Sequence, residues 1–172
     1  MKGGAMRNEE FEKIYRLYYR PLMFYALSLV KQKADAEDLV AETMVRAFLS
    51  YDGKSDLRAW LFHVLKNLFI DETRKKKRVV YSEKELLESF ADPKSFIQRW
   101  IFEEDRRWLY QQIYLLPDLE RNVMLLTLTS GLKDDQIAAQ LNIKSEYLRV
   151  IRNRTKNKLK EIARKEGQDG RE

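Results

Sequence analysis

The stretch that most constrains the fold of this chain runs from Gly131 to Leu159. A short segment, Lys133 to Leu141, carries apolar residues at helical spacing, and Asn142 after it tolerates the left-handed conformation of a tight turn. Ser145 then provides a favourable cap for a second, longer helix. The stretch therefore predicts a helix-turn-helix.

The second of these helices combines an apolar stripe with basic flanks. Its stripe recurs at spacings of three and four residues and consists of Leu148, Ile151, Thr155, Leu159 and Ile162. The other faces carry eight lysines and arginines between Arg149 and Lys165. This combination is typical of a helix that reads the major groove of DNA. The alternative is a solvated, lysine-rich last helix of a bundle, and the pattern alone leaves both open.

The remainder of the chain also has the pattern of a helical protein. Of its 172 residues, 44% are hydrophobic and 35% are charged, while only three are proline and six are glycine. No run of alternating apolar and polar residues is long enough to propose a sheet. The length suits one domain or two small ones. We therefore expect an all-α protein.

Charge and residue content restrict the kinds of function. The net charge of +6 and the isoelectric point of about 9.4 favour a polyanionic partner, without choosing between DNA, RNA and acidic lipid. With no cysteine and a single histidine, His63, disulfides and cysteine metal sites are excluded and a histidine metal site is not expected. The sequence has no nucleophile–base set, phosphate-binding loop or metal cluster, so neither an enzyme nor a cofactor is expected.

No segment is expected to cross a membrane. The longest apolar run, Leu22 to Val30, is shorter than a bilayer requires. Glu9, Glu10 and Glu12 precede this run, so a secretory signal is a poor fit. We expect a cytoplasmic protein.

Residues 79–94 separate two predicted domains. This segment has no clean period, is locally acidic and contains Asp92-Pro93, which suits a flexible linker. The first domain then covers residues 8–78, and the second covers residues 95–166.

The first domain is expected to contain three helices. They begin near Asn8, at Asp35 and at Leu57, and the last extends to about Arg78. Pro21 is expected to kink or split the first helix. In the second helix Leu39 should face inward, and the outward residues are Asp35, Asp38, Glu42, Thr43 and Arg46. Spacing alone favours a plain solvated face for them.

The second domain is expected to begin with two helices before the helix-turn-helix. One runs from Ser95 to Leu116, where Pro117 stops it. Asp118 is expected to cap the next helix, Leu119 to Ser130, and Gly131-Leu132 to end it. The residues of this helix expected in the core are Val123, Leu125, Leu126 and Leu128.

A polar loop precedes the third helix, which is basic and aromatic. The loop runs from Tyr51 to Asp56, with Gly53 as its turn. One side of the following helix carries Arg58, Phe62, His63, Asn67 and Arg74, and a basic run from Arg74 to Arg78 ends it. Because bases stack on aromatic rings and cations neutralise phosphates, this is a usable surface for single-stranded DNA. The alternative keeps Trp60 and Phe62 in the core and leaves the basic run solvated.

Four motifs occur in a fixed order along the chain. They are DAEDLVAET at 35–43; RAWLF at 58–62 with Asn67, Asp71 and Arg74; Leu116-Pro117 with Arg121, Val123 and Leu126; and the helix-turn-helix, with Gly131-Leu132, Ile137-Ala138, Leu141, Ile143, Arg154, Lys158 and Leu159. Together they resemble the extracytoplasmic-function (group 4) branch of the bacterial sigma-70 family, over nearly the whole chain.

The resemblance implies two helical domains, sigma-2-like and sigma-4-like, on a flexible linker. Such a protein binds core RNA polymerase, through its β′ clamp and β flap, and directs promoter-specific transcription initiation. The first domain would bind the clamp and capture the melted −10 element, and the second would read the −35 element. The resemblance also implies an anti-sigma factor as a further partner.

The resemblance also assigns roles by position. The polymerase contact falls on Asp35, Asp38, Leu39, Glu42, Thr43 and Arg46. The −10 element falls on Tyr51, Asp52, Gly53, Lys54, Ser55, Arg58, Phe62, Asn67 and Arg74. The −35 element falls on Lys144, Ser145, Arg149, Val150, Asn153, Arg154 and Lys156. Among these, arginine can pair bidentately with guanine and asparagine with adenine.

The recognition helix departs from the family pattern. Ile151 stands where the pattern has an arginine, and Arg152 stands where it has an apolar residue. The −35 sequence that this helix reads therefore cannot be taken from a relative.

Two other functions fit parts of the sequence. A helix-turn-helix regulator that binds duplex DNA without polymerase core would explain residues 131–159 but leaves residues 35–78 without a role. A helical scaffold or RNA-binding protein would make the basic runs generic and would show no sequence preference.

Overall fold

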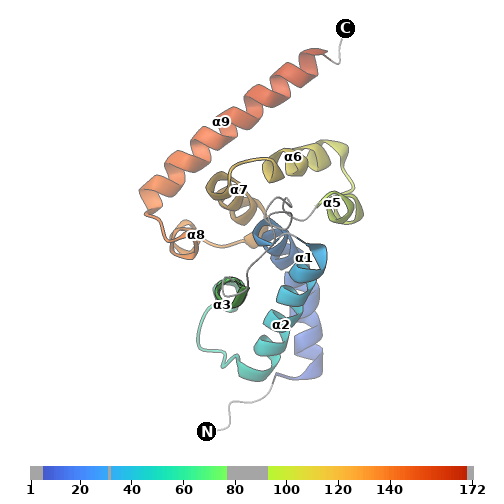
Figure 1. Ribbon diagram of the computed structural model, residues 1–172. Coiled ribbons are helices and arrows are strands. Elements are labelled where there is room, and N and C mark those ends of the chain that lie inside the picture. Colours follow the sequence, from blue (N-terminus) through green and yellow to red (C-terminus); the bar gives the residue numbers. More distant parts are fainter. Residues whose placement is uncertain (1–5, 31, 77–92, 170–172) are drawn as a thin grey trace. The chain divides into compact units, whose positions relative to one another are not determined.

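The chain is helical throughout the part that the structure describes. A computed structural model describes residues 6–30, 32–76 and 93–169, and contains helices but no strand within these ranges. The chain divides into two compact units, Met1–Pro93 and Lys94–Glu172 (Figure 1). The predicted linker lies outside the described residues except for Pro93 and Lys94, and so do Lys77 and Arg78 of the predicted basic run. None of the described helices is both long and apolar enough to cross a bilayer.

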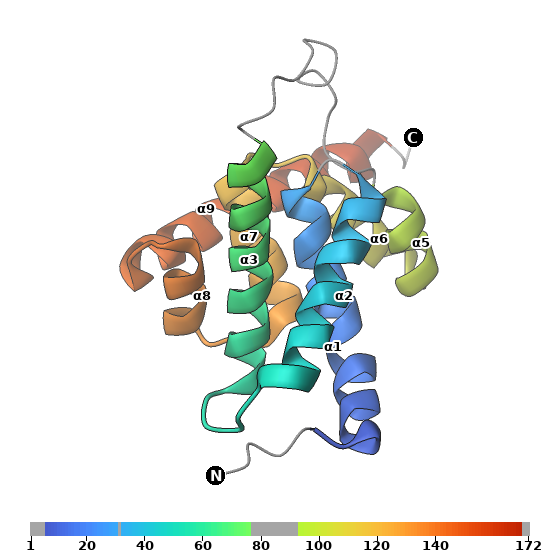
Figure 2. The same ribbon diagram turned by 60° about the horizontal axis from the view of Figure 1, so that its bottom comes forward.

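The first unit packs helices α1 (Asn8–Leu29), α2 (Lys33–Ser50) and α3 (Leu57–Lys76) against one another (Figure 2). Pro21 lies inside α1 and does not split it. Helix α2 begins two residues before Asp35, where the acidic start was expected. Its inward face includes Val40 and Met44, which are almost fully buried. The three helices thus form one apolar core beneath the loop that joins α2 to α3.

Two residues expected on outward faces of these helices lie in the core. Thr43 is fully buried, and its hydroxyl donates to the carbonyl of Leu39, 2.7 Å away, so the polar group needs no water. Phe62 is also fully buried, and its ring lies 5.8 Å from that of Tyr25. The predicted outward placement of both residues was wrong. It relied on the spacing of apolar residues within each helix, whereas packing between the helices decides which side chains are buried.

Asp56 starts helix α3. Its carboxylate accepts hydrogen bonds from the amides of Arg58, at 2.9 Å, and Ala59, at 3.3 Å. These amides belong to the first turn, where no helical carbonyl is available to them. Asp56 is therefore the N-cap of α3.

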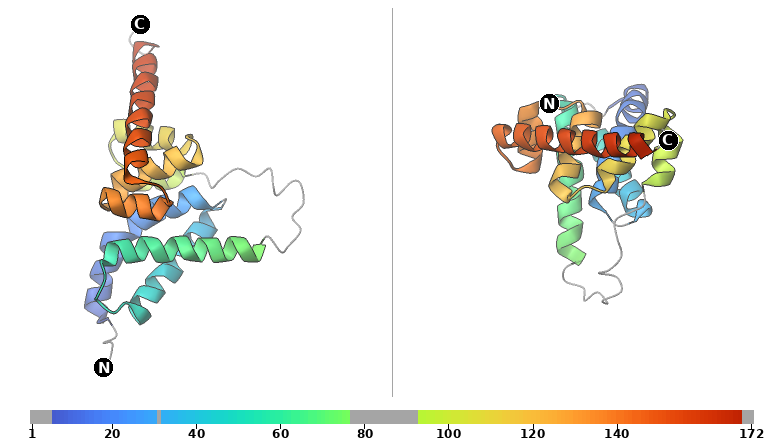
Figure 3. Two further views of the ribbon diagram at one scale, coloured as in Figure 1. Left: turned by 90° about the vertical axis from the view of Figure 1, so that its left-hand side faces the viewer. Right: turned by 90° about the horizontal axis from the view of Figure 1, so that it is seen from above.

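The second unit contains α5 (Lys94–Trp100), α6 (Glu104–Tyr114), α7 (Asp118–Leu125), the π-helical turn η1 (Leu126–Ser130), α8 (Asp134–Leu141) and α9 (Ser145–Asp169). Helix α7 contacts α6, α8 and α9 and is the centre of this unit. Figure 3 shows α9 as a long helix with α8 against its N-terminal part. The core of the unit includes Ile113, Val123 and Leu148, all fully buried.

The single helix expected from Ser95 to Leu116 is broken into α5 and α6. Glu103 has an extended backbone, with φ −79° and ψ 126°, and α6 starts after it. The side chain of Arg107 donates to the carbonyl of Ile101, so a carbonyl at the end of α5 gains a partner. The break leaves Ile101 buried and Phe102 exposed.

Helix α7 also differs from its prediction at both ends. Its N-cap is Pro117, and Asp118 pairs with the buried guanidinium of Arg121 at 2.6 Å instead of capping the helix. At the other end the π turn changes the direction of the side chains, and Leu128 is 44% exposed rather than buried. Gly131, with φ 68°, ends this segment as expected.

The helix-turn-helix has the predicted form. Asn142 between α8 and α9 is left-handed, with φ 55° and ψ 45°. The stripe of α9 faces inward: Leu148, Ile151, Thr155 and Leu159 are at most 5% exposed. Helical periodicity was sufficient here because one face of α9 meets the rest of the unit and the others do not.

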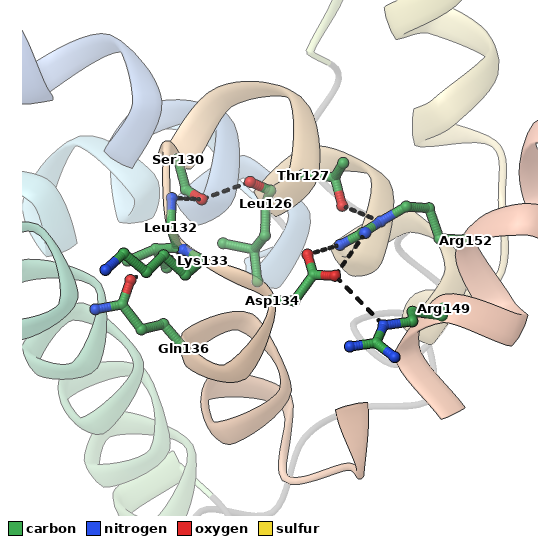
Figure 4. A network of polar contacts seen from close by, with 9 residues as sticks. All are labelled: Leu126, Thr127, Ser130, Leu132, Lys133, Asp134, Gln136, Arg149 and Arg152. Atoms are coloured by element: carbon green, nitrogen blue, oxygen red, sulfur yellow. Dashed lines mark hydrogen bonds and ion pairs between the residues drawn. The ribbon is translucent and has the colours of Figure 1, made fainter. Parts of the chain in front are cut away.

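An ion pair joins three elements around the helix-turn-helix (Figure 4). Asp134 is the first residue of α8, and its carboxylate accepts hydrogen bonds from Nη1 of Arg152 at 3.1 Å and from Nη2 at 2.7 Å. Nε of Arg152 donates to the hydroxyl of Thr127 in η1, 3.1 Å away. The hydrogen bond from Arg152, then its charge, lower the pKa of Asp134 below the ordinary value of 3.8. The start of α8 is thereby fixed to α9 and to η1.

Replacing Asp56 by alanine is expected to destabilise the start of α3 by about 1 kcal/mol, because the amides of Arg58 and Ala59 lose their acceptor. Hydrogen exchange at these two amides, followed by NMR on the full chain, should accelerate about fivefold. Asp52→Ala removes a carboxylate that bonds to Lys54 inside the loop, and is the control. Equal acceleration in both variants would contradict the assignment of the cap.

The Asp134–Arg152 pair is expected to make stability depend on acidity in a defined direction. Because the folded-state pKa of Asp134 lies below its unfolded value, its contribution is present above about pH 4 and is lost as pH falls through the lowered pKa. Since the carboxylate is 41% exposed, solvent screening reduces the contribution to about 0.5 kcal/mol. Urea unfolding of the chain and of Asp134→Asn from pH 7 to pH 3 should give curves that converge at low pH. A constant difference between them would contradict the pairing.

Candidate nucleic-acid interface

Helix α9 presents a polar face that the unit leaves open. Arg149 has 67% of its side chain exposed, Val150 is 47% exposed, and Asn153 is exposed as well. Arg149 and Asn153 are four residues apart, which places them on one side of the helix about one turn from each other. A guanidinium and an amide at this spacing offer paired donors and an acceptor to the edges of two bases.

The two residues that follow Val150 in α9 are turned away from this open face. Ile151 is buried and Arg152 is only 16% exposed, because Asp134 and Thr127 hold its guanidinium. These are the two positions at which the sequence departs from the family pattern. The inward stripe includes Ile151, and Arg152 is turned towards α8. The residues that this face exposes are therefore Arg149, Val150 and Asn153.

Basic residues surround this face. Lys144, Arg154 and Lys156 are all exposed, and Ser145 at the start of α9 is partly exposed. Cations at such positions neutralise phosphates without reading sequence. The sequence-predicted residues of the −35 set thus lie at the turn and along the first turns of α9.

The loop before α3 is a closed turn. The hydroxyl of Tyr51 donates to the carbonyl of Ser55 at 2.5 Å, and the amide of Lys54 donates to Asp52 at 3.0 Å. Gly53 has φ +75°, a conformation that favours glycine, and nothing lies within 4 Å of where its Cβ would be. The exposed residues of the loop are Asp52, Gly53, Lys54, Ser55 and Asp56. A turn of this kind keeps polar groups at a fixed place beside α3.

Aromatic rings support the loop and the start of α3. The ring of Tyr51 lies 5.4 Å from that of Trp60, and burial, followed by the charge of Asp52, raises the pKa of Tyr51. The guanidinium of Arg58 lies 5.7 Å from the centre of the Tyr18 ring. Tyr18 comes from α1, and no local sequence pattern indicates that it lies beside this surface.

The predicted −10 residues of α3 are only partly brought together. Asn67 and Arg74 are exposed, seven residues apart on one face, and the Asn67 amide hydrogen-bonds to His63 at 3.0 Å. His63 is exposed and belongs to this face. Phe62 does not, because it is buried in the core. The sequence-based assignment of Phe62 to the −10 surface is therefore wrong, because a buried ring cannot stack on a base.

A second surface lies on α2 and α3 of the same unit. Asp38, Glu42 and Arg46 are exposed at successive turns of α2, and Arg46 pairs with Glu42 at 3.2 Å. An open groove beside them is lined by Asp38, Ala41, Glu42, Val45, Arg46, Leu68, Asp71, Glu72 and Lys75. Asp35 lies at the start of α2, 3.9 Å from the amine of Lys76.

Two residues assigned to the polymerase contact are not available at this surface. Leu39 is 1% exposed and Thr43 is fully buried. Both face the core, on the opposite side of α2 from Glu42 and Arg46. The surface consists instead of Asp38, Glu42 and Arg46 with the exposed apolar side chain of Val45.

Comparisons with known proteins point to one family. The family profile of sigma-70 region 2 matches residues 14–79. The ECF RNA polymerase sigma factor SigM of Bacillus subtilis is 30% identical over 155 residues, which cover 88% of this chain and 93% of the relative. The ECF RNA polymerase sigma factor EcfG of Rhodopseudomonas palustris is 32% identical over 145 residues, which cover 80% and 76%.

Solved structures of similar fold cover almost the whole chain. The sigma factor RpoE from Bartonella quintana, solved with the anti-sigma factor NepR, has a TM-score of 0.67 and 26% identity, and the match covers 91% of this chain and 98% of that one. CnrH, solved with the cytosolic domain of CnrY, has a TM-score of 0.61 at 20% identity and covers 94% and 92%, which supports the fold alone. These similarities do not favour an ordinary helix-turn-helix regulator. The chain belongs to the extracytoplasmic-function (ECF) RNA polymerase sigma factors and is an alternative sigma factor of the sigma-70 family.

Proposed function

We propose that this chain divides promoter recognition between its two units. Residues 8–78 form the domain that binds the β′ clamp and captures the melted −10 element, residues 79–94 are the linker, and residues 95–166 read the −35 element and meet the β flap. The match of sigma-70 region 2 to residues 14–79 and the division of the chain near Pro93 support these boundaries. The observation that carries the proposal is the exposed pair Arg149 and Asn153 above a buried Leu148 and Ile151.

In the second unit, base reading is assigned to Arg149, Val150 and Asn153. Each bidentate contact of this kind gives about 1–3 kcal/mol of discrimination between bases. Lys144, Ser145, Arg154 and Lys156 would contact phosphates, which provides register and salt-dependent affinity. Because one helix-turn-helix has no symmetric copy in the chain, the promoter element should be asymmetric.

In the first unit, −10 recognition is assigned to the loop and to the face of α3. Tyr51, Asp52, Gly53, Lys54 and Ser55 form the loop, whose internal hydrogen bonds support a preorganised base pocket. Arg58, Asn67 and Arg74 lie along α3 beside it, and His63 joins them. Extruding a base costs a few kcal/mol, and a shaped pocket recovers part of this cost only for the correct base.

The polymerase contact is assigned to Asp35, Asp38, Glu42 and Arg46. The exposure of Asp38, Glu42 and Arg46 on successive turns of α2, beside a groove shared with α3, supports a docking role, and Asp35 lies partly exposed at the start of the same helix. We also propose that an anti-sigma factor regulates the chain, because RpoE and CnrH, which share its fold, were solved with the anti-sigma factor NepR and the cytosolic domain of CnrY. The chain itself would catalyse no reaction, since the polymerase supplies the chemistry, and it would act in the cytoplasm, where promoter DNA lies.

Run-off transcription tests the proposed function directly. The full chain is added to bacterial core RNA polymerase on sheared DNA from its own source. Discrete transcripts that require both chain and core are expected, and their start sites define the two promoter elements. Arg149→Ala should lower the yield of these transcripts about tenfold, the loss of one good base contact. Absence of transcripts, with a specific shift of duplex DNA by the chain alone, would indicate a regulator that acts without polymerase.

The double variant Asp38→Ala with Glu42→Ala is expected to keep its fold and to lose at least about tenfold in affinity for core polymerase, because exposed charges at an interface are removed without opening the core. Affinity is measured by fluorescence anisotropy of the labelled chain, and the fold by circular dichroism. The matched control removes two exposed acidic residues from the start of α1, Glu9 and Glu10. Equal affinity of the double variant and the wild-type chain would refute the assigned contact.

A further inference from the structure

Asp134 holds two arginines of the recognition helix in different ways. Arg152 donates both terminal nitrogens and keeps 16% of its side chain exposed. Arg149 approaches the same carboxylate through Nε, 3.8 Å from Oδ2, and keeps 67% of its side chain exposed. One carboxylate therefore fixes one arginine inside the unit and faces the other from the side.

The atom by which Arg149 meets Asp134 matters for recognition. The contact uses Nε, and Figure 4 shows the two terminal nitrogens of Arg149 pointing away from the carboxylate. Bidentate recognition of guanine needs a fork of parallel N–H donors in a fixed plane. An ion pair at the Nε edge favours this orientation of the exposed guanidinium and leaves its terminal nitrogens for a base.

Asp134 is itself held in place independently of Arg149. It is the first residue of α8, where the helix dipole favours a negative charge, and Arg152 and Thr127 fix the pair to α9 and η1. An anchor of this kind does not move with the side chain that it orients. Arg152, which the family pattern does not have, adds to this anchor, but the start of α8 already places the carboxylate beside Arg149.

We propose that Asp134 is a positioning residue for −35 recognition, which holds Arg149 by its Nε edge so that the terminal nitrogens face one base pair. The inference rests on the proposed function of α9 as the −35 reader. Asp134 touches no DNA in this role and acts through Arg149. The charge of Asp134 also weakens attraction of Arg149 to phosphates, so its effect is on selectivity rather than on total affinity.

The test uses holoenzyme reconstituted from core polymerase and full-length chain. Its probes are a promoter duplex from the run-off experiment and duplexes in which each −35 base pair is replaced in turn. Asp134→Asn keeps the shape and removes the charge. It should reduce discrimination about tenfold at the base pair that Arg149→Ala also affects. Affinity for non-promoter DNA should stay equal or rise, with a salt dependence steeper by about one phosphate contact.

Three comparisons separate positioning from a structural role. Asp135→Asn removes a neighbouring exposed charge of α8 and should leave discrimination unchanged. Asp134→Asn combined with Arg149→Ala should discriminate no worse than Arg149→Ala alone, because Asp134 acts through Arg149. Arg152→Leu removes the Asp134–Arg152 ion pair but keeps Asp134 beside Arg149, and should retain most of the discrimination. Equal losses of discrimination in Asp134→Asn and Arg152→Leu would show that Asp134 acts only through its ion pair with Arg152 and would overturn the inference.

The failure of this inference is distinguishable from the failure of the proposed function. If Arg149→Ala weakens discrimination at a −35 base pair and Asp134→Asn does not, the positioning role is wrong and the reading face remains. If Arg149→Ala affects no −35 base pair, both the reading face and the positioning role are wrong. Circular dichroism and the urea midpoint of each variant confirm that the compared chains are folded.

Discussion

The candidate recognition surface of this sigma factor depends on the burial of one stripe of α9. Side chains on a helix leave the axis at fixed angles, so burying Leu148 and Ile151 decides where every other residue of the first turns points. Arg149, Val150 and Asn153 then face outward, while Arg152 lies at the edge, within reach of α8. Because α7 packs against both α8 and α9, the same apolar contacts hold the turn between them. The stripe therefore provides both the folding energy of the helix-turn-helix and the register of its polar face.

The burial of this stripe explains the two departures from the family pattern, Ile151 and Arg152. An apolar residue at 151 extends the buried stripe, and an arginine at 152 exchanges an apolar contact for a two-pronged ion pair with Asp134. Partly buried ion pairs of this kind add little net stability, but they fix geometry, because the guanidinium accepts few orientations. The two hydrogen bonds between Arg152 and Asp134 thus fix the orientation of α8 relative to α9 in this chain. The residues that α9 exposes follow from the burial pattern of this chain and not from the sequence of a relative.

Much of the fold could be predicted from the sequence, and the misses share a cause. The stripe of α9, the left-handed Asn142 and the glycine at 131 are local signals, and all three are confirmed. The break between α5 and α6 carries no glycine or proline, and apolar residues continue across it, so periodicity alone could not find it. Thr43 and Phe62 were placed outward, yet their burial is decided by neighbouring helices. Tyr18 and Asp134 belong beside the candidate surfaces through contacts with residues 40 and 18 positions away, respectively, which no local pattern encodes.

The separation between the inner stripe and the outer face of α9 has an evolutionary consequence. Val150 and Asn153 are exposed, and substitutions at exposed positions usually change folding stability by no more than about 0.5 kcal/mol. A duplicated gene of this kind can therefore exchange these residues one at a time while its product stays folded. In the proposed −35 role of this face, each exchange would alter the promoters that the product selects. Paralogues within one genome can in this way acquire separate regulons before they acquire any difference in architecture.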